Sequence, residues 1–443
     1  MIDQAGQTID EVIQPEVAVR TVRQSRLRIP VWAATLGMLI AMAAVFWNTL
    51  GIRTTGLVED WPTYEYYDWF GITFQTLAYT NADNRPFLLW IYALGHFLTP
   101  DSFIGLQILS ILMFIGSGML LYGLVRQLLP NKPVVAFMAA ALFVIYPADT
   151  GLFNTRYLPF QLAVVAYLAA VSLLILFWRR PRWWSLVGMW GVLLFCLGIV
   201  ETAFPLAAVS PLVLIWLNKR VSRQVVRAAG AWYLLLIGMI VFTIRAMSGG
   251  NTLTSILLTP DTNPPLVRFG NYALYALRPY SRVFVDGWTE VIHAFSIGSV
   301  DFVTSALVFA FLVSLLGILV IVGLVIPNQS PSNTDNPSVR RSRVYRAIYA
   351  RRAALILFGI GLVVIGLGFL PYVVVPGFRT VTDRVFLFSS IGGAVCISLI
   401  VYGIGSLIRR VPFVIPLLFG ALLWLAAANG LGRAVGLRYD SSQ

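Results

Sequence analysis

Long apolar runs separated by short polar segments dominate the chain. A helix needs about 20 apolar residues to cross a bilayer, and fewer where one end is buried in protein. The alternation of apolar and polar positions that builds membrane barrels is absent. The pattern therefore predicts an all-α, polytopic membrane protein of about eleven transmembrane helices. The predicted spans are 30–50, 102–125, 133–147, 158–178, 185–200, 203–217, 230–246, 302–326, 353–375, 385–408 and 411–428.

Composition supports the membrane interpretation. Hydrophobic residues make up 58% of the chain and charged residues 12%, with a mean hydropathy of +0.80. A soluble domain needs far more polar side chains to cover its surface. The first 28 residues are polar, and the first apolar run is too long for a signal peptide, so we expect that run to be a retained span.

Charge predicts the orientation of the spans. The net charge of +13 comes from arginines in short loops, which indicates topology rather than nucleic-acid binding. With a cytoplasmic N-terminus, most basic residues lie inside and most acidic residues lie outside, as expected for a bacterial plasma membrane. The predicted organisation is a cytoplasmic tail (1–29), a transmembrane domain (30–428) with outer loops 51–101 and 247–301 and a cytoplasmic linker 327–352, and a C-terminal tail (429–443).

The first outer loop carries the most informative chemistry. Glu59 and Asp60 are adjacent carboxylates just beyond the first span, and aromatic residues surround them. The aromatic residues are typical of a membrane interface. Asp60 is a candidate general base, and the pair could also bind a divalent cation. No cofactor is certain from the sequence.

An Arg-Pro-Phe segment opens the short apolar stretch 88–98, which we expect to lie along the membrane surface. Arg85 could bind a lipid phosphate, because its guanidinium group is a forked donor. An ion pair with a loop carboxylate is the alternative for this residue.

Further polar residues lie at the same predicted membrane face. Glu201 stands in a long uncharged stretch, where an ionisable group is costly and is expected to face a polar cavity or a partner. Asp383 and Arg384 begin the tenth span, either as a local helix-capping pair or as part of a site. The third span ends in a Tyr-Pro-Ala-Asp segment at Asp149, and an Asn-Thr-Arg-Tyr segment containing Arg156 opens the fourth.

Acids and arginines at one outer face suggest a reaction between an anionic, lipid-linked substrate and a neutral hydroxyl group. A sugar carried on a lipid phosphate has a good leaving group, which cationic side chains or a metal would stabilise. A single carboxylate acting as base predicts inversion at the anomeric carbon, by analogy with single-displacement glycosidases.

The order of these motifs resembles the GT-C superfamily of membrane glycosyltransferases. An acid-acid-Trp segment follows the first span, and Arg-Pro-Phe precedes the second. The Tyr-Pro and Asn-Thr-Arg segments, and the run Asp-Arg-Val-Phe-Leu-Phe-Ser-Ser-Ile-Gly from Asp383, are similar to segments of the transmembrane and tetratricopeptide-repeat O-mannosyltransferases and their bacterial relatives. The resemblance covers about residues 30–410.

The resemblance implies roles for individual residues. Asp60, with Glu59 beside it, stands where these enzymes carry their catalytic acid. Contacts to the donor phosphate are expected from Arg85, Arg156 and Arg384. A supporting polar pocket is expected from Asp149, Glu201 and Asp383.

Three departures from the family pattern limit the resemblance. Glu59 replaces the first Asp of the pair, which weakens the case for a metal, and the metal stays unknown. Val200 stands where the family has Lys, and Ser389 stands where it has Pro. No tetratricopeptide repeats follow, so the acceptor of those relatives is not carried over.

We therefore expect a glycosyltransferase that moves a monosaccharide from a polyprenyl-phosphate donor to a hydroxyl acceptor at the extracytoplasmic face. Its partners would be the donor lipid, the bilayer and an acceptor glycan, lipid or protein, with no nucleic acid. Two other classes remain open. One is a transporter or lipid flippase with Glu201 as its coupling site, and the other is a non-catalytic subunit of a membrane complex.

Overall fold

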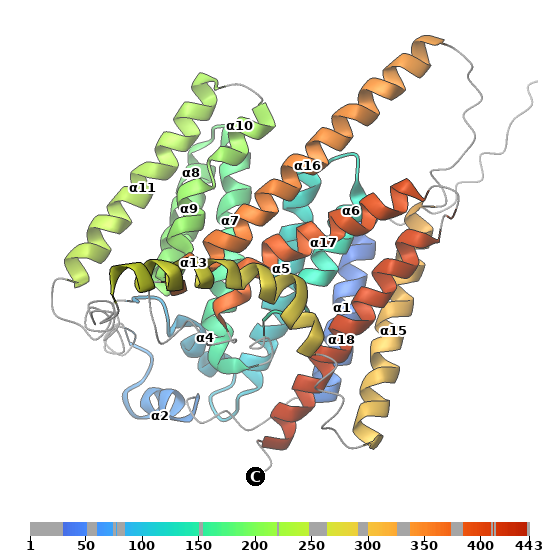
Figure 1. The fold of residues 1–443 in the computed structure, drawn as a ribbon. Coiled ribbons are helices and arrows are strands. Elements are labelled where there is room, and N and C mark those ends of the chain that lie inside the picture. The colour runs from blue at the N-terminus through green and yellow to red at the C-terminus, as the bar shows by residue number, and fades with distance from the viewer. Residues whose placement is uncertain are drawn as a thin grey trace, which may run out of the picture.

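The computed structural model describes a helical bundle (Figure 1). Every regular element in the described part of the chain is a helix, which confirms the all-α fold class. The described residues are 30–50, 60–73, 77, 85–149, 154–218, 221–247, 264–290, 300–325, 337–373, 384–408, 411 and 413–440.

Long helices form the body of the bundle, and shorter helices connect them. The long helices are α1 (Val31–Leu50), α5 (Ile104–Leu128), α7 (Leu158–Arg179), α11 (Arg223–Met247), α15 (Val300–Val325), α16 (Pro337–Val373), α17 (Leu387–Leu407) and α18 (Val414–Asp440). The shorter helices are α2 (Asp60–Phe70), α4 (Trp90–Leu98), α6 (Pro133–Phe143), α8 (Trp183–Ile199), α9 (Phe204–Val209), α10 (Leu212–Asn218) and α13 (Pro265–Ser281). Single turns are η2 (Thr155–Tyr157), η3 (Glu201–Ala203), η4 (Arg282–Asp286, a π-helix) and η7 (Arg384–Phe386).

Nine helical segments among the described residues are long and apolar enough to cross a membrane. Eight are the long helices, and the ninth is the broken run Glu201–Asn218, which contains η3, α9 and α10. The other two predicted spans coincide with the shorter apolar helices α6 and α8. The protein is therefore an integral membrane protein by the length and composition of its helices, and the count of eleven spans stays a prediction.

Helix α6 is short because it lies inside the bundle. All of its residues after Pro133 are buried, and it packs against α1, α5 and α17. Its small side chains, including the run Ala139–Ala141, let neighbouring helices approach closely. A helix that is surrounded by protein does not have to match the thickness of the lipid.

Helix α16 is longer than the predicted span 353–375. It is one continuous helix from Pro337, so the second half of the predicted cytoplasmic linker 327–352 is helical and joined to the span. In Figure 1 this N-terminal half extends beyond the bundle. Residues 326–336, which include the first part of the predicted linker, lie outside the described part of the chain.

Charged residues lie at both ends of the bundle. Helices α2 and α4, from the predicted outer loop 51–101, lie together at one end, which we call the α2 end (Figure 1). Their acids include Glu65 and Asp68. The connections α7–α8 and α10–α11 lie at the opposite end, which carries Arg179, Arg180 and Arg223. The predicted charge sorting and the identity of the cytoplasmic end stay predictions.

Helices α16 and α17 pack with their backbones in close contact. A Cβ atom on Gly392 would lie 2.3 Å from the carbonyl oxygen of Gly361, and one on Gly361 would lie 2.5 Å from Cys396 Sγ. The Ser389 hydroxyl donates to the carbonyl of Ile365 at 2.8 Å across the same contact. Small residues of this kind drive helix association where lipid removes the hydrophobic force. This contact fixes the start of α17, from which site residues project.

The substitution Gly392→Ala should destabilise the protein by about 1–3 kcal/mol, because the new methyl group overlaps backbone that cannot move aside. Gly403→Ala is the matched control on the same helix, since nothing lies within 4 Å of a Cβ atom there. Thermal unfolding of both variants in detergent measures the difference. Equal unfolding midpoints would show that α16 and α17 are not in backbone contact.

Candidate functional site

Arg85 and Glu201 form a two-pronged ion pair, although 116 positions separate them. Arg85 Nε donates to Oε2 at 2.9 Å, and Nη2 donates to Oε1 at 2.6 Å. The side chains are 18% and 25% exposed, so the pair is largely shielded from solvent. The Arg85 fork therefore binds the carboxylate of Glu201 and not an acid of the first outer loop, and a phosphate contact of Arg85 stays a prediction.

The neighbouring backbone explains why Arg85 reaches Glu201. The Phe87 amide donates to the Gly198 carbonyl at 3.3 Å, and the Phe87 ring lies 5.2 Å from the ring of Phe195. A Cβ atom on Gly198 would lie 2.4 Å from the Phe87 ring. The Arg-Pro-Phe segment is thus docked on the last turn of α8, immediately before Glu201.

A second cationic residue is buried deeper in the protein. Arg282 is only 3% exposed and makes a two-pronged ion pair with Glu290, in which Nη2 donates to Oε2 at 2.6 Å. Its Nε donates to the carbonyl oxygen of Ala148 at 3.2 Å. The adjacent backbone is also close, because a Cβ atom on Gly287 would lie 2.9 Å from the Ala148 amide. Arg282 thereby ties η4 to the turn that carries Asp149.

Arg278 lies one helical turn before Arg282, and both guanidinium groups approach the ring of Phe386. Their central carbons lie 5.8 Å and 5.9 Å from its centroid. Burial and the positive charge of Arg282 lower the pKa of Arg278. Phe386 also stacks on Phe369, with centroids 4.9 Å apart. We call Arg278 and Arg282 the arginine cluster. The charge of Arg282 is compensated by Glu290, so Arg278 is the member of the cluster that could attract an anion.

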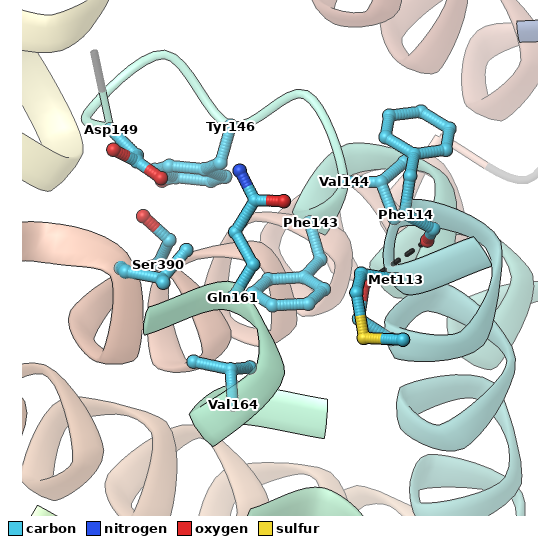
Figure 2. A pocket seen from close by; sticks show the side chains of 11 residues that line it. Met113, Phe114, Phe143, Val144, Tyr146, Asp149, Gln161, Val164 and Ser390 are labelled. Atoms are coloured by element: carbon cyan, nitrogen blue, oxygen red, sulfur yellow. Dashed lines mark hydrogen bonds between the residues drawn. The ribbon is translucent and has the colours of Figure 1, made fainter. Parts of the chain in front are cut away.

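Asp149 lines a small, mostly apolar cavity at the start of α7 and α17 (Figure 2). The cavity volume is about 30 Å³. Asp149 is 7% exposed, and Gln161 and Ser390 are also buried. Figure 2 shows the Ser390 hydroxyl on the side of Asp149, and Gln161 extending toward Tyr146. The Tyr146 hydroxyl donates to the Val283 carbonyl at 2.9 Å, which links the cavity to η4. We call this space the Asp149 cavity.

Helix α2, which begins at Asp60, is held against α4. Asp68 Oδ1 lies 2.7 Å from His96 Nε2, and the rings of Tyr64 and Tyr67 pack on the imidazole at 5.1 Å and 5.6 Å. Burial raises the pKa of Tyr67, whose neutral hydroxyl donates to the Leu89 carbonyl at 3.3 Å. These contacts fix the orientation of the helix that carries the candidate base.

The structure brings only some of the predicted site residues together. Arg85 and Glu201 are in contact, whereas Asp149 belongs to the Asp149 cavity, beside the arginine cluster. Arg156 is exposed in η2, where its amide donates to Asn154 Oδ1 at 2.9 Å. Asp60 and Arg384 begin α2 and η7, but their side chains lie outside the described part, as do Glu59 and Asp383.

Other contacts join these elements at one end of the bundle. The Tyr92 hydroxyl of α4 donates to the Thr155 carbonyl at 3.2 Å, which holds η2 against α4. The Tyr372 hydroxyl of α16 donates to Thr202 Oγ1 at 3.5 Å, which places η3 beside the end of α16. Through Phe369 and Phe386 that end also meets the arginine cluster. Segments from distant parts of the chain are thus joined at this end of the bundle.

Sequence reasoning did not identify the ion pairs of Arg282 and His96. Their partners Glu290 and Asp68 lie in helical segments of the two predicted outer loops, and the sequence does not predict how these segments pack. One available signal was the spacing of Arg278 and Arg282, because residues four apart lie on one face of a helix. In the described residues, no three His, Cys, Asp or Glu side chains gather as metal ligands. A divalent cation at Glu59 and Asp60 stays a prediction.

Comparisons with known proteins give no relative from which to transfer a function. The chain matches no protein-family model, and no curated protein matches it significantly. The site must therefore be interpreted from its own chemistry.

A double-mutant cycle on Arg85 and Glu201 should show coupling. Each of Arg85→Gln and Glu201→Gln leaves one partly buried charge without its partner, whereas the double variant removes both charges. We expect a coupling of about 1–3 kcal/mol from the unfolding of the four proteins in detergent. Additive effects would mean that the pair makes no energetic contribution.

Proposed function

We propose that this protein is a GT-C-type glycosyltransferase of a bacterial plasma membrane. It would transfer a monosaccharide from a polyprenyl-phosphate donor to a hydroxyl acceptor at the extracytoplasmic face. The observation that carries the proposal is the hydrogen bond from buried Arg282 to the Ala148 carbonyl, next to Asp149. This bond brings Arg278 and the Arg282–Glu290 ion pair beside a cavity lined by a carboxylate. A phosphate and a sugar require these two environments side by side.

The arginine cluster is the best-supported place for the donor phosphate. The forks of Arg85 and Arg282 are engaged with Glu201 and Glu290. Arg278 is half-buried at the Phe386 ring, and η7, which begins at Arg384, contributes that ring. We assign the direct phosphate contact to Arg278 because it is half-buried beside the apolar face of α13, and Arg384 is a second candidate for that contact. Arg156, which is exposed, remains a further candidate for a contact to the donor phosphate.

The exposed side of α13 supports a lipid as the carrier of that phosphate. Large apolar side chains project from it, namely Leu266, Phe269, Leu274 and Leu277, which are 64% to 83% exposed. An apolar face on a helix that also carries arginines is typical of a helix at a membrane interface. A lipid tail could lie along this face while its phosphate meets Arg278.

The proposed reaction needs one base. The acceptor oxygen attacks the anomeric carbon and the bond from that carbon to the phosphate oxygen breaks. The polyprenyl phosphate leaves with the electron pair, and the acceptor proton passes to the carboxylate of Asp60. Attack opposite the leaving group inverts the anomeric configuration. The contacts of His96 with α2 support this role by fixing the helix that begins at Asp60.

Asp60→Asn should abolish turnover and leave donor binding unchanged, because only the base is lost. We expect a fall in kcat of at least about 100-fold. The assay supplies a panel of radiolabelled polyprenyl-phosphate hexoses to membranes that contain the protein, and it follows transfer to the acceptors in those membranes. Asp101→Asn is the control, since Asp101 is an exposed acid between α4 and α5. A variant at Asp60 with full turnover would contradict the proposed base. Movement of the donor lipid across vesicles without any transfer would favour a flippase.

Arg278→Gln should weaken binding of polyprenyl phosphate by roughly 10–100-fold, because a charged hydrogen bond contributes about 1.5–3 kcal/mol. Arg268→Gln is the matched control, ten positions earlier on α13. Equilibrium binding of the labelled lipid to purified protein measures both. Equal affinities of the two variants would show that Arg278 does not bind the phosphate.

A further inference from the structure

A basic surface lies at the end of the bundle opposite α2, on the connections α7–α8 and α10–α11 (Figure 1). Its side chains are all exposed, and we call them the Arg-Trp surface: Arg179, Arg180, Arg182, Trp183, Trp184, Arg223 and Arg227. The sequence from residue 150 to residue 260 contains one acid, Glu201, which binds Arg85 at the α2 end. Within the described part of the chain, no carboxylate forms an ion pair with these arginines. Their charge is therefore available to an external anion.

The turn between α7 and α8 has an ordered backbone. The Arg180 amide donates to the Leu176 carbonyl at 2.8 Å, and the Arg182 amide donates to the Arg180 carbonyl at 2.8 Å. The buried Ser185 hydroxyl donates to the Arg182 carbonyl at 2.7 Å in the first turn of α8. These backbone groups are engaged within the protein, whereas the arginine side chains of the turn are exposed. The turn thus presents its guanidinium groups outward.

Helix α11 brings further arginines beside this turn. The Trp190 indole of α8 donates to the Ala231 carbonyl of α11 at 2.8 Å. Both helices begin at the end opposite α2, and this bond lies about two helical turns from the start of each helix. Packed helices lie about 8–10 Å apart, so the first turns of α8 and α11 lie side by side. Arginines from the two connections can therefore approach the same ligand.

Two tryptophans lie between the arginines and the apolar side of α8. Trp183 is 77% exposed and Trp184 is 45% exposed, directly after Arg182. Val187, which is 56% exposed, continues this side one turn further along the helix. Trp is enriched where hydrocarbon meets the headgroups, and basic residues next to it lie at the level of the lipid phosphates. The order Arg, Trp, Val along the chain therefore matches the order phosphate, interface, acyl chain in one leaflet.

Basic residues also set the orientation of membrane spans, and this role alone is the alternative for these arginines. Orientation requires positive charge in a loop, but it does not require two connections to converge beside exposed tryptophans. A guanidinium fork suits a phosphate group. We infer that the Arg-Trp surface binds the phosphate headgroup of an anionic phospholipid in the leaflet at that end of the bundle. This inference does not depend on the proposed transferase function.

The test compares phosphatidylglycerol with phosphatidylcholine, which carry the same labelled acyl chains. Equilibrium binding of each to the purified full-length protein is measured in a neutral detergent, and the ratio of the affinities cancels partition into micelles. Arg182→Gln/Arg223→Gln removes one charge from each connection, and Arg182→Lys/Arg223→Lys keeps the charges without the forks. The control Arg245→Gln/Arg268→Gln removes one charge from the last turn of α11 and one from α13.

The wild-type protein and the control should prefer phosphatidylglycerol by at least about 10-fold. In Arg182→Gln/Arg223→Gln this preference should fall to about two-fold or less, because each base near an anionic headgroup strengthens binding several-fold. The Lys variant should show an intermediate preference. Higher salt should weaken the preference, since exposed charges are screened. A cooperative unfolding transition in detergent checks that each variant is folded.

Several outcomes would overturn the inference. Equal affinity of the wild-type protein for the two lipids would limit the arginines to orienting the spans. A preference that persists in Arg182→Gln/Arg223→Gln, or that the control loses equally, would show that the surface holds no site. Polyprenyl phosphate, titrated in the same way, should bind every variant alike. If Arg182→Gln/Arg223→Gln lost this lipid and kept phosphatidylglycerol, the surface would belong to the donor. A wild-type protein that prefers phosphatidylglycerol but does not bind polyprenyl phosphate would support the inference and reject the proposed transferase.

Discussion

A guanidinium group buried in an apolar bundle must have its donors satisfied, and the arrangement of the candidate site follows from how Arg282 meets this demand. Two of its nitrogens bind Glu290, and the third binds the carbonyl of Ala148. Breaking such a buried pair by removing one partner is strongly destabilising. Arg282 therefore holds η4 against the turn after α6, and this contact places Arg278 and Asp149 on opposite sides of one small region.

Hydrophobic pattern predicted most of the bundle, because a span is defined by a local property of about 20 residues. The helices from α15 to α18 lie within a few residues of the predicted spans, apart from the extensions of α16 and α18. Helices α6 and α8 fall short of a full span. For α6 the reason is that protein surrounds it, and burial by neighbours cannot be read from a single run of residues. The basic part of the linker 327–352 was expected to form a separate helix at the membrane surface, and its continuation into the span as one helix, α16, was not predicted.

The candidate site was less predictable, because its partners meet only in the folded chain. The cost of burying a charge correctly indicated that Glu201 has a polar environment, and Arg85 supplies it. The identity of that partner depends on how Phe87 docks on α8, which no local pattern encodes. The role of Arg282 was hidden for the same reason. Its sequence surroundings resemble an exposed loop, whereas its position between Glu290 and Ala148 is buried.

The central claim is that one end of the bundle holds a lipid phosphate at the arginine cluster with its sugar toward Asp149. A cryo-electron microscopy structure with a bound polyprenyl-phosphate hexose tests it most directly. The account predicts phosphate density within hydrogen-bonding distance of Arg278, a lipid tail along the exposed face of α13, and the hexose between Arg278 and the Asp149 cavity. Phosphate density at the opposite end of the bundle, or remote from Phe386, would contradict the account.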